Sequence, residues 1–494
     1  MKEIRFTDTT FRDGNGSLWA QGMKTSMMLA VAANMDKAGF NVMEVIGNSY
    51  FKKCIRELKE NPWERIRLLA KALPNTKMVS MSGPNPSSPF EIAPQALIRL
   101  HLQCLATNGI RRLHIMDPSN EMTGRLALAV QFAHEVGLEV AVALVFSLSP
   151  RHTDEYYAQK AKEAVGIGAD LVYLKDPGGL LTPERARTIV PAILKSLEGV
   201  QLEFHTHCTT GLGPTTLLAA VEAGVDTVHT AVPPLANGSS QPSVFNVVSN
   251  LKALGYGTLI NEEPLRQVSK ELTSIAKREG LPTGQPLEYD YSQYIHQVPG
   301  GVISNLRHQL KQMQLGDRLP EVLEESVRVR QDLGYPIMVT PFSQFVVSQA
   351  TMNVLTGKRY SLVTDEVIKY VLGTYGEEAS NAVPDEIRDI ILEHPRVKQL
   401  AHDTPPEPSL HEIRQSLGGT ISDEELLLRY AVGGSTEVES MRMAEATTST
   451  PSTVTVPTIK KLLAALDAND ELRHVSLQRS GLSLKVSAAA DETP

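Results

Sequence analysis

Residues 171–208 are LVYLKDPGGLLTPERARTIVPAILKSLEGVQLEFHTHC, in which two apolar, strand-like runs flank an amphipathic helical stretch. The first run carries Lys175 near its end, and the second carries His205 and His207. A strand, a helix and a second strand in this order predict a parallel βαβ unit. We therefore expect an α/β fold in which neighbouring strands end in ionisable side chains.

The same pattern recurs through the first 260 residues, where eight short runs rich in β-branched residues alternate with helical stretches. Eight βαβ units of this total length match the usual size of a closed (β/α)₈ TIM barrel. A doubly wound sheet is the alternative, but no G-x-G-x-x-G turn follows the first run. The runs are IRFTDTT (4–10), NVMEVIG (41–47), KMVSMSG (77–83), RRLHIMD (111–117), EVAVALVFS (139–147), LVYLKDPGG (171–179), LEFHTHC (202–208) and TVHTAVPP (227–234).

Composition narrows the class of protein. A chain of 494 residues is longer than one hydrophobic core usually accommodates, so we expect more than one domain. The formal net charge of −8 offers no basic surface for nucleic acid, which leaves a small molecule as the expected ligand. Three scattered cysteines, with neither an apolar signal segment nor a run of about 18 apolar residues, predict a cytoplasmic protein without a membrane span.

The sequence pattern predicts four segments. Residues 1–260 form the barrel, and longer amphipathic stretches over 261–403 predict a helical domain that completes the funnel to the site. Residues 404–457 contain TPPEP and TTSTPSTVTVP, which predict a linker region. Residues 458–494 predict a helix followed by a hairpin around Ser480 and Gly481, a unit too small to be stable alone.

Ionisable residues near the ends of these runs predict a metal site. His205 and His207 are two residues apart on a strand, so their imidazoles point to the same face. Asp13, just after the first run, adds a carboxylate from a strand close to the seventh in a closed barrel. Imidazole and carboxylate together suit Zn²⁺, Mn²⁺ or Co²⁺, whereas two rim histidines bonded to the backbone are the alternative.

Lys175 is unusual in such a site because an ammonium group repels a cation. A desolvated, deprotonated amine could instead react with CO₂ to give a carbamate, which binds metal as a carboxylate does. The alternative is a surface pair of Lys175 with Asp176. Sequence spacing leaves both open.

A series of ordered motifs between Ile4 and Gly376 resembles the carboxyltransferase segment of biotin-dependent enzymes: pyruvate carboxylase, the oxaloacetate decarboxylase alpha subunit and the transcarboxylase 5S subunit. The motifs are TDTTFRDG (7–14), NPWER (61–65), SPRHTDEYY (149–157), LKDPGGLLTP (174–183), HTHCTTG (205–211), GSSQP (238–242), QVPGGVISNL (297–306) and DLGYPIMVTPFSQ (332–344).

This resemblance implies a divalent ion held by Asp13, His205, His207 and a carbamylated Lys175. It implies that carboxybiotin releases CO₂, that the metal stabilises the enolate of the acceptor as a Lewis acid, and that the enolate carbon attacks CO₂. Thr340 matches the hydroxyl that moves the proton between biotin and the acceptor. Its alternative role is to cap a helix that begins near Ser343.

The sequence departs from the family at two substrate-binding positions. Gly16 replaces the glutamine of D-A-H-Q-S, and Ser82 replaces the arginine of L-L-R-G that grips the acceptor's carboxylate. An arginine–carboxylate contact contributes about 1.5–3 kcal/mol, so pyruvate should bind weakly unless Arg12 or another cation substitutes. We expect a wider, less cationic pocket and an acceptor that is bulkier than pyruvate or lacks its carboxylate.

Biotin belongs on a separate subunit, because the look-alike Met441-Arg442-Met443 offers an arginine where a carrier needs lysine. The expected function is the carboxyltransferase component of a biotin-dependent carboxylase or decarboxylase. Its expected partners are the biotin carboxyl carrier and biotin carboxylase subunits, and the chain is expected to form a homo-oligomer, a dimer or larger. Residues 458–494 resemble the leader segment of a carrier subunit and are expected to act in assembly.

Two other functions compete with this one. Aldolase and Claisen-condensing enzymes, such as isopropylmalate synthase and hydroxymethylglutaryl-CoA lyase, share D-x-T-x-R-D-G and H-x-H, but LKDPGGLLTP, QVPGGVISNL and VTPFSQ fit the carboxyltransferases better. A non-catalytic scaffold is the second alternative. Retention of all four metal-site residues and Thr340 argues against it.

Overall fold

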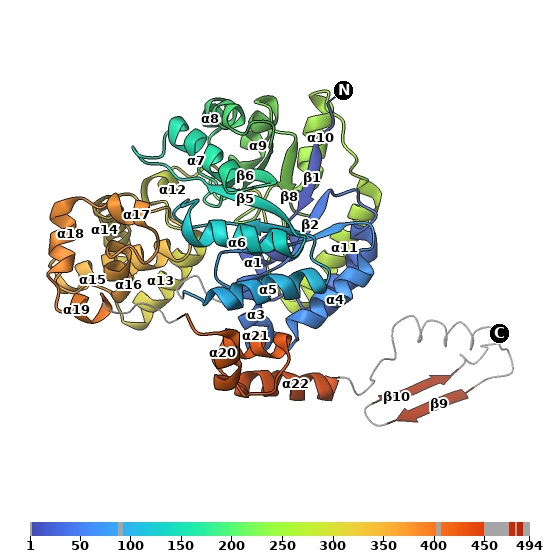
Figure 1. The fold of residues 1–494 in the computed structure, drawn as a ribbon. Helices are drawn as coiled ribbons and strands as arrows, with labels where there is room; N and C mark the ends of the chain where they lie inside the picture. Colours follow the sequence, from blue (N-terminus) through green and yellow to red (C-terminus); the bar gives the residue numbers. More distant parts are fainter. Residues whose placement is uncertain (1, 87–91, 402–406, 449–473, 480–481, 488–494) are drawn as a thin grey trace. The chain divides into compact units, whose positions relative to one another are not determined.

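The structure is a computed structural model that describes residues 2–86, 92–401, 407–448, 474–479 and 482–487 (Figure 1). The chain forms two compact units, residues 1–442 and residues 443–494, each of which is described by itself below. Among the helices that the structure describes, none has an apolar stretch long enough to cross a bilayer.

The first unit contains a closed barrel of eight parallel strands, which confirms the predicted TIM barrel and all eight predicted strands. The barrel closes where β1 pairs with β8. The strands are β1 (Arg5–Asp8), β2 (Val42–Gly47), β3 (Lys77–Ser82), β4 (Arg112–Ile115), β5 (Glu139–Val145), β6 (Leu171–Asp176), β7 (Gln201–Thr206) and β8 (Thr227–Thr230).

Helices cover the outside of the barrel, as Figure 1 shows. Their buried faces are apolar and share one hydrophobic core with the outward-facing residues of the strands. This outer layer contains α2 (Thr25–Met35), α4 (Pro62–Ala72), α5 (Gln95–Thr107), α6 (Gly124–Glu135), α7 (Asp154–Gly166), α8 (Pro183–Ser196), α9 (Gly213–Glu222), α10 (Val244–Ala253) and α11 (Glu262–Glu279).

The interior of the barrel is polar over much of its circumference, although barrels are usually filled by branched apolar residues. Arg112 on β4 donates to Glu203 on β7 over 2.8 Å, a contact between strands that are not neighbours and therefore one that crosses the interior. Ala141, Ala143 and Val145 of β5, the strand next to β4, form an apolar part of the interior. Charged pairs and small apolar residues thus share the interior of the barrel.

A helical region follows the barrel and has its own hydrophobic core. Its connection to the barrel is direct, because Ile337 is buried in the cluster that contains Ala143 and Val145. The helices are α12 (Ser292–His296), α13 (Gly300–Gln312), α14 (Leu319–Asp332), α15 (Phe342–Thr356), α16 (Asp365–Val371), α17 (Glu377–Asn381), α18 (Asp385–Leu392) and α19 (Val397–Leu400).

The boundary between the barrel and the helical domain was expected at residue 261, which is one helix too early. The apolar face of α11, including Leu265, Val268 and Leu272, is fully buried in the barrel core, and α11 packs on α2. The core of the helical region begins only at Val298. The amphipathic pattern predicted the helix correctly, but it does not show which core receives its apolar face.

The expectation of a linker over 404–457 is wrong for residues 410–448, which form α20 (Leu410–Ser416), α21 (Asp423–Val432) and α22 (Thr436–Thr448). Ser409 is the N-cap of α20 and forms a capping box with Glu412. The Ser409 hydroxyl accepts from the backbone N–H of Glu412, and the Glu412 carboxylate accepts from the backbone N–H of Ser409. Leu426 of α21 is fully buried in the same core as the barrel helices, and Arg67 of α4 pairs with Glu424. The prolines and threonines around these helices suggested a linker, although α21 packs on the barrel helices.

Replacing the fully buried Leu426 with alanine tests this docking. Leu426→Ala should lower the free energy of unfolding by about 3 kcal/mol, because it removes buried methyl groups from a shared core. Ile390→Ala, at a side chain that is 48% exposed, is the control and should change it by no more than about 0.5 kcal/mol. Urea unfolding measures both, and an unchanged Leu426→Ala midpoint would mean that α21 contributes nothing to the fold.

The second unit contains an antiparallel hairpin of β9 (His474–Arg479) and β10 (Leu482–Ser487), which confirms the predicted hairpin. Val475 pairs with Val486 and Leu477 with Leu484 across the two strands. The helix expected after residue 458 lies outside the described residues, as does the expected linker over 449–457.

Candidate metal centre

Asp13 lies on a π-helical turn, η1 (Thr10–Gly14), immediately after β1. The start of the turn is fixed by Thr10, whose hydroxyl donates to Asp8 over 2.5 Å. Its end requires glycine, because a Cβ at Gly14 would lie 2.8 Å from the carbonyl oxygen of Leu235. The turn thereby places the Asp13 carboxylate over the ends of β6 and β7.

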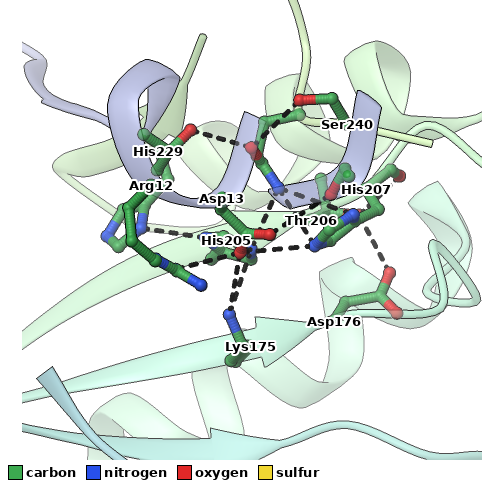
Figure 2. Close-up of polar contacts among 12 residues, drawn as sticks. Arg12, Asp13, Lys175, Asp176, His205, Thr206, His207, His229 and Ser240 are labelled. Atoms are coloured by element: carbon green, nitrogen blue, oxygen red, sulfur yellow. Dashed lines mark hydrogen bonds and ion pairs between the residues drawn. The ribbon is translucent and has the colours of Figure 1, made fainter. Parts of the chain in front are cut away.

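Asp13, Lys175, His205 and His207 converge at this end of the barrel, as the sequence predicted. Lys175 Nζ lies 3.3 Å from Asp13 Oδ2 and 3.3 Å from His205 Nε2 (Figure 2). Asp13 Oδ2 lies 3.3 Å from His205 Nε2 and 3.6 Å from His207 Nε2. All four residues are buried, with no more than 9% of any of them exposed.

The geometry of His207 turns its Nε2 toward Asp13, where that atom could bind a cation in place of its contact with Gln241 at 3.0 Å. Its Nδ1 lies 2.7 Å from the backbone oxygen of Ser239, which can only accept, so Nδ1 carries the proton. The lone pair is therefore on Nε2, the atom that faces Asp13. His207 thus bonds to the backbone through one nitrogen, and its other nitrogen lies where a ligand to a cation would have to be.

Lys175 is not the surface partner of Asp176. The Asp176 carboxylate accepts hydrogen bonds from the backbone of Leu180 and Leu181 and from Thr206, on the other face of β6. Burial lowers the pKa of Lys175, Asp13 opposes this effect, and Arg12 adds to it. A lowered pKa increases the fraction of free amine, which is the form that can react with CO₂.

Arg12 is buried beside Asp13, where its Nη2 lies 3.0 Å from Asp13 Oδ2. Its guanidinium also donates to Glu44 from Nε, over 2.8 Å, and from Nη2. Burial opposes ionisation of Asp13, but Arg12 and then Lys175 hold the pKa of that carboxyl well below its usual range. Among the described residues no hydrogen bond uses Nη1 of Arg12, so that atom can donate to a ligand.

A second group, Glu44, His114 and His229, also brings three possible ligand atoms together, deeper in the barrel. His229 has no free lone pair for a cation, since its two nitrogens lie 3.1 Å from His205 Nδ1 and 2.8 Å from Glu203. Glu44 is bound by Arg12 and by His114. The Asp13 group is therefore the better metal site. The alternation of side chains along β4 and β8 could have predicted that His114 and His229 point into the barrel. It could not have predicted the hydrogen bonds that they form there.

Thr340 lies on the segment that joins the helical region to the barrel. Ile337 is buried against residues at the end of β5, and Val339 packs on the same cluster. Thr340 follows Val339 and is exposed, and its Oγ1 accepts a hydrogen bond from Gln344 over 3.2 Å. The alternative role as a helix cap does not apply, because Pro341 is the residue that precedes α15.

The two departures from the family have different surroundings. A Cβ at Gly16 would lie 3.0 Å from the hydroxyl of the buried Tyr50, so Tyr50 takes the space there and the expected widening at Gly16 is wrong. Ser82 is buried, accepts a hydrogen bond from Asn48 over 2.7 Å, and lines a small cavity with apolar walls.

Comparison with known proteins defines the class. Residues 3–272 match the HMGL-like family and residues 294–464 match the conserved carboxylase domain. The carboxyltransferase domain of Rhizobium etli pyruvate carboxylase, solved with pyruvate and biocytin, is a solved structure with the same fold. It has a TM-score of 0.80 at 24% identity, with 90% of this chain and 78% of that chain covered. The barrel and the helical region together are thus a carboxyltransferase fold.

The relatives show the family. A pyruvate carboxylase subunit of Methanocaldococcus jannaschii is 36% identical, with 89% of this chain and 78% of the relative covered. The methylmalonyl-CoA carboxyltransferase 5S subunit of Propionibacterium freudenreichii subsp. shermanii is 30% identical, with 87% and 86% covered. The 2-oxoglutarate carboxylase large subunit of Hydrogenobacter thermophilus is 32% identical, with 87% and 67% covered.

The chain belongs to the biotin-dependent carboxyltransferase family of these carboxylase subunits. This confirms the predicted family and enzyme class, and it favours that class over the aldolase and scaffold alternatives.

Two variants decide which of the two groups binds an ion. Asp13→Asn should weaken the affinity for Zn²⁺, Mn²⁺ or Co²⁺ by at least about 100-fold, since loss of a ligand costs at least as much as loss of an outer partner. His114→Gln, in the deeper group, should leave it within about threefold, because His114 does not contact the Asp13 group in the described structure. Competition with a chromophoric chelator measures both. Weak binding by His114→Gln and normal binding by Asp13→Asn would place the ion in the deeper group.

Proposed function

We propose that this chain moves CO₂ between carboxybiotin, carried on a separate subunit, and the enolate of a small carbonyl acceptor. The observation that supports this most is the buried group of one carboxylate, one amine and two imidazoles at the barrel mouth. Transfer of CO₂ requires a site that excludes water and still handles one proton. The group at the barrel mouth meets both conditions.

Asp13, His205, His207 and Lys175 would hold a divalent ion, of which Zn²⁺, Mn²⁺ and Co²⁺ fit the nitrogen and oxygen ligands. Such an ion supplies Lewis acidity that stabilises negative charge on the acceptor's carbonyl oxygen. The Lys175 amine would add CO₂ to form a carbamate and release one proton. The carbamate brings a negative charge to a position where an ammonium would repel the cation.

The proton of the reaction is assigned to Thr340. As the acceptor loses a proton from carbon, the hydroxyl takes it and gives its own proton to the ureido nitrogen of biotin. The nitrogen–carboxyl bond of carboxybiotin breaks and a carbon–carboxyl bond forms on the acceptor, so atoms and charge balance. Arg12 would bind the acceptor through Nη1, which lies in a guanidinium already oriented by Glu44.

The acceptor differs from pyruvate in this proposal. Ser82 cannot form the two parallel hydrogen bonds that arginine forms with a carboxylate. We therefore assign an acceptor that is bulkier than pyruvate, or one without a carboxylate next to its carbonyl group.

Turnover with a panel of acceptors tests this function. The full chain with carboxylated carrier should carboxylate an uncharged ketone or a longer-chain acceptor at least about tenfold faster than pyruvate, as loss of a contact of about 1.5–3 kcal/mol implies. Thr340→Ala should lower that rate by about 10²–10⁴-fold, and Thr340→Ser should retain most of it. Pyruvate or oxaloacetate turnover as fast as any other acceptor's would contradict the assignment, and equal rates for the alanine and serine variants would remove Thr340 from the reaction.

The partners in this proposal are the biotin carboxyl carrier and biotin carboxylase subunits, in a cytoplasmic assembly in which this chain is a dimer or larger. Residues 458–494 are assigned to assembly because their sequence resembles the leader segment of a carrier subunit. The three described cysteines are free and buried, which is compatible with a reducing compartment.

Deleting Thr458–Pro494 should abolish co-elution with the purified carrier and carboxylase subunits in size-exclusion chromatography. It should leave the midpoint of thermal unfolding of residues 1–442 unchanged, because those residues form a compact unit without it. Complex formation that survives the deletion would contradict an assembly role for the segment.

A further inference from the structure

His205, one of the four residues at the barrel mouth, contacts a second buried histidine from the next strand. Its Nδ1 lies 3.1 Å from Nδ1 of His229, and Figure 2 shows this contact on the side of His205 away from Lys175. Both side chains are fully buried. In a hydrogen bond between two imidazole nitrogens, one must donate and the other must accept.

The contacts of the other nitrogen of His229 indicate which of the two imidazoles donates. His229 Nε2 lies 2.8 Å from Glu203 Oε2, and Arg112 donates to Glu203 Oε1 over 2.8 Å. Burial alone would raise the pKa of Glu203, but the bond from His229 and the charge of Arg112 lower it to about 2. An ionised carboxylate only accepts, so His229 Nε2 carries a proton.

The proton on His229 Nε2 then determines the state of His205. Because His229 Nε2 donates to Glu203, the tautomer of His229 with a single proton has its lone pair on Nδ1, toward His205. In that arrangement His229 accepts at Nδ1, and His205 donates from its own Nδ1. The lone pair of His205 is left on Nε2, the atom that faces Asp13 and Lys175.

A separate contact agrees with this assignment. The side-chain nitrogen of Gln241, which can only donate, lies 3.4 Å from His205 Nε2 and 3.0 Å from His207 Nε2. Both Nε2 atoms thus face the Gln241 donor, in addition to the Asp13 carboxylate at 3.3 and 3.6 Å. His207 owes its orientation to a backbone oxygen, whereas His205 depends on side chains alone.

We propose that Arg112, Glu203 and His229 form a positioning chain that holds His205 in the one tautomer able to bind a cation. The proposal rests on the proposed ion site, which it deepens by identifying residues that act on a ligand without touching the ion. His229 is the residue that passes the effect of Glu203 to His205. Substituting it should change His205 and leave His207 as it is.

The test compares His229→Leu with His229→Gln and with Tyr173→Phe in the full chain. Leucine removes the acceptor for His205 Nδ1, whereas the amide oxygen of glutamine can replace it. Tyr173 is buried in the same layer and stacks on His229, but its hydroxyl has no hydrogen-bond partner among the described residues. It therefore serves as the matched control for disturbance of packing.

The first readout is the tautomer of His205 in metal-free protein labelled with ¹⁵N-histidine, with its signal assigned by its loss in His205→Gln. Wild type and Tyr173→Phe should show a proton on Nδ1, and His229→Leu should move it to Nε2. The second readout is Co²⁺ affinity, which should fall about 10–100-fold in His229→Leu and recover in His229→Gln.

Each outcome bears on one proposal. A proton on Nε2 of His205 in wild type would overturn the positioning chain, as would unchanged Co²⁺ affinity in His229→Leu. Equal losses in His229→Leu and Tyr173→Phe would also overturn it, because they would show a packing effect. If wild type shows the Nδ1 proton but binds no Co²⁺, the proposed ion site fails while the tautomer assignment stands.

Discussion

The structure depends on the burial of ionisable groups inside the barrel, which is possible only because each has a partner. An isolated charge in such a place costs several kcal/mol, and pairing offsets that cost only with good geometry. Arg112 meets Glu203, and Arg12 meets both Glu44 and Asp13. These contacts explain why the mouth holds side chains in fixed orientations.

That constraint also orders the barrel into two levels. At the deeper level His229 uses both nitrogens, toward Glu203 and His205, and His114 uses Nδ1 toward Glu44, while its Nε2 has no partner among the described residues. At the mouth, Asp13 faces two imidazole Nε2 atoms and an amine whose pKa is lowered chiefly by burial. The mouth thus brings a carboxylate and two imidazole nitrogens to one point, whereas the deeper level has one imidazole nitrogen without a partner among the described residues.

Much of this could be predicted from the sequence, because strand periodicity and the rule that barrel sites lie at strand ends brought Asp13, Lys175, His205 and His207 together. The contact between His205 and His229 could not, since side-chain hydrogen bonding between two strands depends on rotamers that spacing does not specify. Residues 410–448 were mistaken for a linker because their burial depends on the barrel surface. The contact of Tyr50 with the space beside Gly16 was missed because the sequence does not show which distant side chain packs against a glycine.

The central claim is that the Asp13 group binds one divalent ion with Lys175 as a carbamate. Anomalous diffraction from crystals of the full chain grown with Mn²⁺ or Zn²⁺ and bicarbonate tests it most directly. The account predicts one ion coordinated by Asp13, His205 and His207, with density for a carboxyl group beyond Lys175 Nζ. An ion at Glu44 and His114, or an unmodified Lys175 beside an ion at the mouth, would contradict it.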